Sequence, residues 1–309
     1  MALNPSNLTQ NATFAALQQA EFDTKRTGPF AGGHNAVVFL TASDVTRPSR
    51  FLEMVEKQSS STATELSYLP SVYANSSTLR AGFGAQKELL SRALVSRQST
   101  QAESPVAGDT YALVVLQKPF ARGTIYIDPR NPMDGGPLID FQTMANPIDM
   151  EMLLESMKFI RKWSATSAMS VLSPVEQWPN TDFAEKKQAI LQSADPSKAH
   201  ALVPDQGVED ERLRIHIRSN AESGIGHESG TCAMMPLELG GVVGPDLLVH
   251  KVRRLSVVDS SIMPLIPSTN LCATVYAVAE KVSLPVPVLQ SSSFRSSEND
   301  EFGRDGSIC

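Results

Sequence analysis

Three short β-prone runs in the middle of the chain constrain its fold more than any other feature. They are TYALVVLQKP (110–119), GTIYIDP (123–129) and GPLIDFQTM (136–144), and Pro, Gly, Arg and Asn residues separate them. Runs rich in β-branched and aromatic residues, bounded by turn-forming residues, are typical of strands joined by short connections. Neighbouring strands joined so closely pair antiparallel, because a parallel pair needs a crossover of a dozen or more residues. The sequence therefore predicts an antiparallel meander within residues 112–144.

A helical pattern follows the third run. The segment ANPIDMEMLLESMKFIRKW places Met150, Leu153, Leu154, Met157 and Ile160 at helical spacing. Because residues three and four apart lie on the same side of a helix, we expect this helix to pack its methionine-rich side against one face of the sheet. Weaker patterns predict a strand ending in AVVFL, a surface loop at 95–109, a loop-rich stretch at 165–206 and helices at 13–24, 50–57, 84–94, 183–192 and 209–223. The expected fold class is α+β, with a mixed, mostly antiparallel sheet and flanking helices.

Composition and charge narrow the classes of partner. The chain has 309 residues, of which 41% are hydrophobic and 19% charged, as is ordinary for a soluble globular protein. Its formal net charge is −6, and the longest basic cluster is Lys251 to Arg254. Because phosphate binding needs clustered Lys and Arg, nucleic acid is not expected as a partner.

The sequence also lacks the patterns of membrane, exported and metal proteins. No stretch reaches the roughly 18 apolar residues that span a bilayer, and the first residues do not resemble a signal peptide. We therefore expect no membrane association and a cytoplasmic location by default. Cys232, Cys272 and Cys309 are far apart and show no Cys/His spacing, so neither a metal site nor a disulfide framework is expected.

One histidine lies in an unusual setting. The stretch GIGHESGTCAMMP (224–236) places His227 inside a turn rich in glycine and small residues. A lone histidine is often only a polar residue in a bend, but an imidazole with an unperturbed pKa near 6.5 also suits proton transfer near neutral pH. The residues around His227 alone leave both interpretations open.

The motifs that follow decide between them. VVDSSIMP (257–264) and STNLCATVYAVAEK (268–281) come after the histidine turn in this order. Together the three motifs resemble the C-terminal signature of the glucose-methanol-choline (GMC) flavoprotein oxidoreductases, and the fungal secondary-metabolism branch in particular. Upstream, RTGPF, ARGTIYIDP and NPIDMEMLLE are similar to landmarks of the family's substrate domain.

The resemblance implies a flavin reaction and assigns roles to individual residues. It implies FAD as cofactor and a small-molecule alcohol as substrate, with hydride passing from the hydroxyl-bearing carbon to flavin N5. His227 matches the family's catalytic base. Asn270 matches its second catalytic position, where an amide can hydrogen-bond the developing alkoxide. Asp259, Ser260, Asn270 and Leu271 are carried over as cofactor contacts. Asn270 could also cap the helix that follows it, and Asp259 could be only a turn residue at the end of a strand.

The sequence departs from the family's pattern at both ends. It contains no GxGxxG or other phosphate-binding loop, so the Rossmann-like N-terminal half that holds the ADP part of FAD is expected to be missing or supplied by a partner chain. After the YAVAEK helix, residues 282–290 carry two prolines that end it. We therefore expect a substrate-binding domain at 1–223, a flavin-contacting segment with the catalytic motifs at 224–283 and a disordered tail at 284–309.

Three functions remain open at this stage. The first is an FAD-dependent alcohol oxidase or dehydrogenase of secondary-metabolite biosynthesis. The second is a non-redox cyclase or dehydratase that reuses the His227 pocket for acid–base chemistry. The third is a truncated, inactive remnant or binding module that lacks FAD. In each case the apolar strands of 224–283 are expected to stay partly uncovered without a further domain, which predicts poor solubility or a partner.

Overall fold

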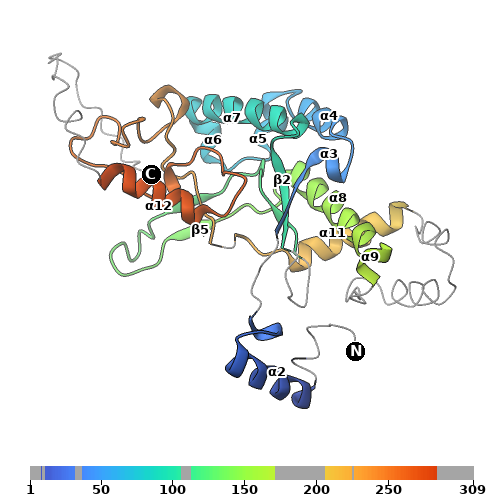
Figure 1. Ribbon diagram of the computed structural model, residues 1–309. Helices are drawn as coiled ribbons and strands as arrows, with labels where there is room; N and C mark the ends of the chain where they lie inside the picture. The colour runs from blue at the N-terminus through green and yellow to red at the C-terminus, as the bar shows by residue number, and fades with distance from the viewer. Residues whose placement is uncertain are drawn as a thin grey trace, which may run out of the picture. The chain divides into compact units, whose positions relative to one another are not determined.

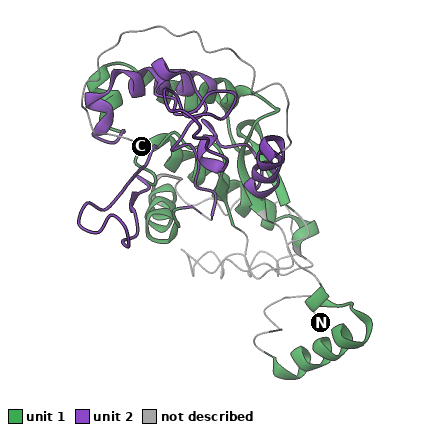
Figure 2. Ribbon diagram, turned by 90° about the vertical axis from the view of Figure 1, so that its left-hand side faces the viewer, with its two compact units in different colours: residues 1–68, 90–121, 143–223 green, residues 69–89, 122–142, 224–309 purple. Residues whose placement is uncertain are grey.

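The computed structural model describes residues 8, 11–31, 37–105, 113–170, 206–224 and 226–283. The predicted helix at 183–192 and the predicted disordered tail at 284–309 lie outside these residues, as does most of the loop-rich stretch. The fold is α+β and about half helical, with small antiparallel sheets. It divides into two compact units, which Figure 2 colours green and purple: unit 1 is 1–68, 90–121 and 143–223, and unit 2 is 69–89, 122–142 and 224–309.

Unit 1 contains a three-stranded antiparallel sheet and most of the helices. Its helices are α2 (Ala12–Lys25), η1 (Pro29–Ala31), α3 (Ala42–Val45), α4 (Ser49–Gln58), α5 (Thr62–Leu66), α8 (Pro147–Ser164), α9 (Ser167–Ser170) and α11 (Gln206–Asn220). The sheet has the order β1 (Val37–Thr41), β2 (Thr100–Pro105), β3 (Val115–Leu116). Val38 faces Ser104 and Ala102 faces Leu116, and the register shifts between Leu40 and Thr41.

The start of α8 is fixed by polar side chains. Asn146 caps the helix by accepting from the Ile148 amide at 3.0 Å, and Pro147 takes the first helical position, where a missing N–H costs nothing. Asn146 also exchanges two hydrogen bonds with Gln58 of α4, at 2.9 and 3.1 Å. Asp149 is buried and accepts from the backbone amides of Phe120 and Ala121 at 2.7 and 2.8 Å. These bonds set the position of α8 against the sheet.

The predicted methionine-rich helix is confirmed as α8, which contacts β2 and β3 and packs against α11 (Figure 1). Met150 and Leu154 form a buried cluster with Leu213 and Ile217 of α11. Ion pairs flank this cluster: Arg161 with Glu209 at 2.5 Å, Lys158 with Asp210 at 2.8 Å and Arg214 with Glu151 at 2.7 Å. The helix pair therefore combines an apolar seam with paired charges around it.

Unit 2 carries the motif segments and a hairpin. Its elements are α6 (Val72–Asn75), the first part of α7 (Ser77–Val95), β4 (Thr124–Tyr126), β5 (Leu138–Asp140), η3 (Leu237–Leu239), η4 (Ser260–Ile262) and α12 (Leu271–Ser283). β4 and β5 pair antiparallel, with Ile125 facing Ile139. Between Asp246 and η4 the structure has only turns and isolated bridges, Val243 to Val249 and Leu248 to Ser256. The strand Leu255 to Val258, expected to end at Asp259, is therefore wrong.

The prediction of one continuous meander is also wrong. The first run contributes β3 to the unit 1 sheet, whereas the second and third runs form the separate β4–β5 hairpin. The physical reason lies between the first two runs, where the Phe120 and Ala121 amides bond to Asp149 instead of to a neighbouring strand. The runs are antiparallel as expected, but in two small sheets.

The predicted surface loop at 95–109 is corrected as well, because residues 100–105 form β2. Gln101, Ala102, Glu103 and Ser104 are all buried there. Glu103 accepts from the Gln117 side chain at 2.6 Å, and Ser104 donates to the Leu113 carbonyl at 2.8 Å. A strand whose buried residues are mostly polar shows no apolar alternation, which is the signal that marks a half-buried strand in a sequence.

Candidate functional site

The turn that carries His227 depends on its glycines. Gly224, Gly226 and Gly230 have φ values of 68°, 79° and 88°, a backbone region that other residues rarely adopt. At Gly230 an added Cβ would also lie 3.1 Å from the Met263 carbonyl oxygen. At Gly226 an added Cβ would meet nothing within 4 Å, so the space directly before His227 is open. The three glycines therefore allow backbone conformations that other residues rarely adopt, and Gly226 leaves room beside the half-buried His227.

Hydrogen bonds join this turn to the second motif. Ser260 Oγ donates to the Glu228 carbonyl at 2.7 Å. The Cys232 amide donates to the Ser261 carbonyl at 2.9 Å, and the Met234 amide donates to the Ile262 carbonyl at 2.7 Å. A direct hydrogen bond thus joins Glu228, which follows His227, to Ser260, which follows Asp259.

Asp259 and Ser260 have structural contacts of their own. Asp259 is exposed and caps η4, because its Oδ1 accepts from the Ser261 amide at 2.8 Å. Ser260 is half-buried, and its hydroxyl donates to the Glu228 carbonyl. The contact with the Ser261 amide is the one expected of a turn residue. The role of Asp259 toward a cofactor stays a prediction.

Asn270 and Leu271 lie at the start of α12. Asn270 is exposed, whereas the Leu271 side chain is buried in a cluster with Val243, Leu247, Ile262 and Met263. Leu271 therefore has only its backbone to offer a ligand, and its side chain instead anchors α12. Because Ile262 belongs to the same cluster, the second and third motifs are packed together in unit 2.

Gln86 of α7 is a site-supporting residue that the sequence did not reveal. Its Nε2 donates to the Pro264 carbonyl at 2.9 Å and lies 3.4 Å from Met235 Sδ, while its Oε1 accepts from Arg122 Nε at 3.0 Å. The Arg122 guanidinium lies 5.5 Å from the centre of the Phe83 ring. One amide thus connects both motif segments to the residue that leads into β4. No motif signals this role, since Gln86 lies 149 and 178 residues from its two partners in the motifs.

The surface of unit 2 exposes large apolar side chains. On α12, Tyr276 is 69% exposed and Val282 is 42% exposed, although most of this helix is apolar. Val252 and Leu255 are about half exposed in the segment before η4. Within the described part of the chain, no group of His, Cys, Asp and Glu side chains could hold a metal ion. None of the helices described there has both the length and the apolarity to cross a membrane.

The comparison with protein families decides the class of protein. The C-terminal family model described as GMC oxidoreductase matches residues 119–279, which is more than half of the chain. The chain belongs to the GMC oxidoreductase family. Its matched part includes the β4–β5 hairpin, α8, the first two motifs and the third motif up to Ala279. Members of the family bind FAD.

Relatives of this GMC oxidoreductase are fungal secondary-metabolism dehydrogenases. A dehydrogenase of Armillaria gallica is 27% identical over 290 residues, which cover 89% of this chain and 39% of the relative. The dehydrogenase xptC of Emericella nidulans is 28% identical over 209 residues, covering 67% of this chain and 29% of the relative. The chain thus spans well under half the length of these relatives.

Two solved structures share the fold. An FAD-dependent oxidoreductase from Chaetomium thermophilum matches with a TM-score of 0.70 and 25% identity, and a fungal aryl-alcohol oxidase matches with a TM-score of 0.68 and 28% identity. Each match covers 90% of this chain and 43% of the solved one.

Proposed function

We propose that this chain is the substrate-domain and catalytic-motif part of an FAD-dependent alcohol oxidase or dehydrogenase of secondary-metabolite biosynthesis. The observation that carries the proposal is the joining of the His227 turn to the Asp259 segment by the Ser260–Glu228 hydrogen bond and the two backbone bonds beside it. Membership of the GMC family supports the reaction class. The name of the fungal aryl-alcohol oxidase suggests a primary alcohol on an aromatic body as the substrate to test first.

The chain's own residues would handle the proton and the oxygen. His227 would take the proton of the substrate hydroxyl, a step for which a neutral imidazole is suited near pH 7. Asn270 would donate its amide N–H to the same oxygen as negative charge develops there, and removing such a donor typically costs about 3 kcal/mol of transition-state stabilisation. When bound, FAD supplies the hydride acceptor that makes this an oxidation.

The residues present fit one part of FAD. The open space at Gly226 lets a flat ring approach the backbone beside His227, and the Leu271 amide lies in the first turn of α12, next to Asn270. They do not fit the other part, because the sequence has no GxGxxG loop for the pyrophosphate. We infer that the part of the relatives outside the match supplies the pyrophosphate-binding loop, on the same polypeptide or on a partner chain. We also infer that this part covers the exposed apolar side of α12.

The first test determines whether the gene product holds flavin. The transcript is sequenced beyond both ends of the 309-residue chain, and the full product is purified beside the 309-residue chain and assayed for flavin absorption and FAD uptake. We expect the longer product to be yellow. If the full product is this chain alone and takes up no FAD, an independent oxidase is excluded and the remnant or binding-module interpretation holds.

The second test isolates His227 in the flavin-loaded protein. His227→Ala should slow reduction of the flavin by a panel of aryl alcohols by about 10²- to 10⁴-fold, which is the usual contribution of a general base. His216→Gln on α11 is the matched control and should leave this rate unchanged, because the His216 ring is 3.0 Å from the Asn220 side chain of its own helix and matches no motif of the flavin reaction. Turnover that needs His227 but no electron acceptor would contradict the oxidase and favour a cyclase or dehydratase.

A further inference from the structure

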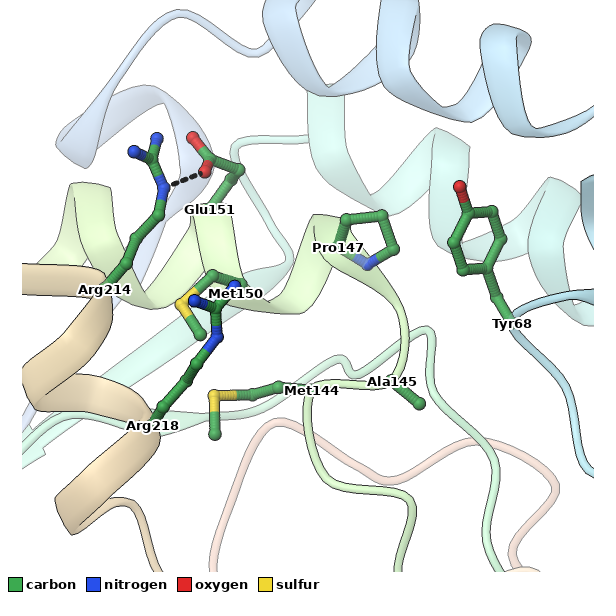
Figure 3. Close-up of a pocket in the computed structure, with 8 residues that line it drawn as sticks. All are labelled: Tyr68, Met144, Ala145, Pro147, Met150, Glu151, Arg214 and Arg218. Carbon is green, nitrogen blue, oxygen red and sulfur yellow. Dashed lines mark hydrogen bonds and ion pairs between the residues drawn. The ribbon is translucent and has the colours of Figure 1, made fainter. Parts of the chain in front are cut away.

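A pocket in unit 1 is lined by none of the residues assigned to the flavin reaction. It has a volume of about 370 Å³ and lies where Tyr68, the lead-in to α8 and the C-terminal part of α11 meet (Figure 3). Ligand sites usually measure about 300 to 1,000 Å³ and combine apolar walls with a few polar groups. This pocket is at the small end of that range and therefore suits a single ring or a short chain.

Apolar side chains form one wall. Met150 is buried, and Met144, Pro147 and the Tyr68 ring are half-buried around the same space. Thioether sulfur makes favourable contacts with aromatic rings and adapts to their shape. Met144 also has a φ of 58°, a left-handed conformation that is rare outside glycine and costs of order 1 kcal/mol or more. Such strain is typical of residues that a site holds in place.

Charged side chains form the opposite rim, and two of the three are ion-paired. Glu151 pairs with Arg214 at 2.7 Å and also with Arg50. The hydrogen bond to Glu151 raises the pKa of Arg214. Arg218 is exposed and has no ion-pair partner among the residues that the structure describes. Arg214 also lies 3.5 Å from Glu211, so Arg218 is the one lining group whose charge no ion pair offsets among the described residues.

The two arginines also repel one another. Arg214 and Arg218 lie four residues apart on α11, and like charges at this spacing destabilise a helix by a few tenths of a kcal/mol. In Figure 3 the Arg218 side chain extends from α11 into the part of the view where Met144 and Met150 are drawn, and all three residues line the pocket. A bound anion would relieve this repulsion and satisfy the fork of donors on Arg218.

We propose that this pocket binds a small monocarboxylate with an aromatic body, its carboxylate on Arg218 and its ring against Met144, Met150 and Tyr68. A planar carboxylate matches the guanidinium donors with two parallel hydrogen bonds. Arg218 is the one arginine of this rim without an ion-pair partner in the described part of the chain, and a single carboxylate would supply it. None of the residues that line this pocket is among those assigned to FAD or to proton transfer.

The test uses the 309-residue chain, 3-phenylpropanoate and its neutral analogue 3-phenylpropanamide. Calorimetry should show the carboxylate binding about tenfold or more tightly than the amide, as expected for hydrogen bonds to a charged group. Arg218→Gln should weaken carboxylate binding by a similar factor. Arg212→Gln, at an exposed position on the same helix, is the matched control and should bind like the unaltered chain. No binding of the carboxylate, equal binding of the amide or equal affinity of Arg218→Gln would each overturn the proposal.

Methionine methyl signals locate the ligand. In protein labelled at the methionine methyl carbons, the signals of Met144 and Met150 should shift on titration with 3-phenylpropanoate. The signal of Met263, which is buried in unit 2, should not. Shifts at Met263 without shifts at Met144 and Met150 would contradict the proposed site. Because no flavin is present, either result leaves the proposed oxidase function to be judged by its own tests.

Discussion

Helix α8 is rich in charged residues but well buried, whereas helix α12 is mostly apolar but exposed. α8 carries six charged side chains in 18 residues and buries seven of its residues, including Asp149 and Glu155. α12 carries two charged side chains in 13 residues and buries only Leu271. Burial normally follows apolar character, because removing apolar surface from water is the main favourable term in folding.

The difference distinguishes a region whose apolar side chains are buried from one whose apolar side chains stay exposed. Around α8 the sheet, α4 and α11 cover the apolar side chains, and α11 supplies ion-pair partners for its charges. α12 is apolar in composition but uncovered, and large exposed apolar surfaces mark interaction sites. The chain spans 39% of the Armillaria dehydrogenase. We therefore interpret the exposed side of α12 as the surface on which the remaining length docks.

The largest effect should come from the covered region. Leu154→Ala removes a fully buried side chain from the α8–α11 seam and should lower the free energy of unfolding by about 2 to 5 kcal/mol. Leu89→Ala is the matched control, because Leu89 is 49% exposed on α7, and should cost within about 0.5 kcal/mol. Urea unfolding measures both. An equal loss of unfolding free energy for the two substitutions would contradict the contrast between the buried α8 region and the exposed surface.

A smaller effect is expected where unit 2 is held by polar bonds. Gln86→Ala removes the hydrogen bonds to Pro264 and Arg122 and should cost about 1 to 3 kcal/mol. Hydrogen exchange should quicken in residues 259–270 more than in α8. Gln86→Glu can still accept from Arg122 but cannot donate to Pro264, so it should reproduce the faster exchange. Unchanged exchange in both variants would mean that burial alone fixes the motif segment.

The next prediction concerns α12 itself. Tyr276→Ala should change the free energy of unfolding of the 309-residue chain by no more than about 0.5 kcal/mol, because the side chain is 69% exposed. It should also lower the binding of an apolar dye. In the full gene product the same substitution should cost several-fold more, about 3 kcal/mol, if the added length buries the ring. The same small effect in both proteins would contradict docking on α12.

Much of the covered region could be predicted from the sequence because local signals agree there. The Asn146 cap, the proline after it and the apolar spacing of Met150 and Leu154 all indicate the same helix, and the structure has it. β2 could not be predicted, because its buried Glu103 depends on Gln117 for a partner. The meander failed for a similar reason: Asp149 captures amides 28 and 29 residues away, and no local pattern reports that bond.

The candidate site divides in the same way. The glycines around His227 could be predicted to form a tight turn, since their positive φ values are a local requirement of the backbone. Gln86 could not be found, because its contacts to Met235 and Pro264 exist only once the chain is folded. The roles of His227, Asp259, Ser260, Asn270 and Leu271 toward FAD stay predictions that the flavin experiments address.

The smallest effect should come from pH, on the covered side of the comparison. Partial burial, and to a lesser degree the Arg161 guanidinium, lower the pKa of His216 on α11. In the unfolded chain the imidazole regains a pKa near 6.5, so below that pH the unfolded state binds more protons than the folded state. The free energy of unfolding should therefore fall as the pH drops from about 6.5 toward the lowered pKa, and level off below it. His216→Gln removes this contribution, so its stability should change less between about pH 7.5 and pH 5.5 than that of the unaltered chain. If stability depends on pH equally in both proteins, His216 is as well solvated as an exposed residue of α12. The packing around α11 would then be looser than its buried neighbours Leu213 and Ile217 indicate.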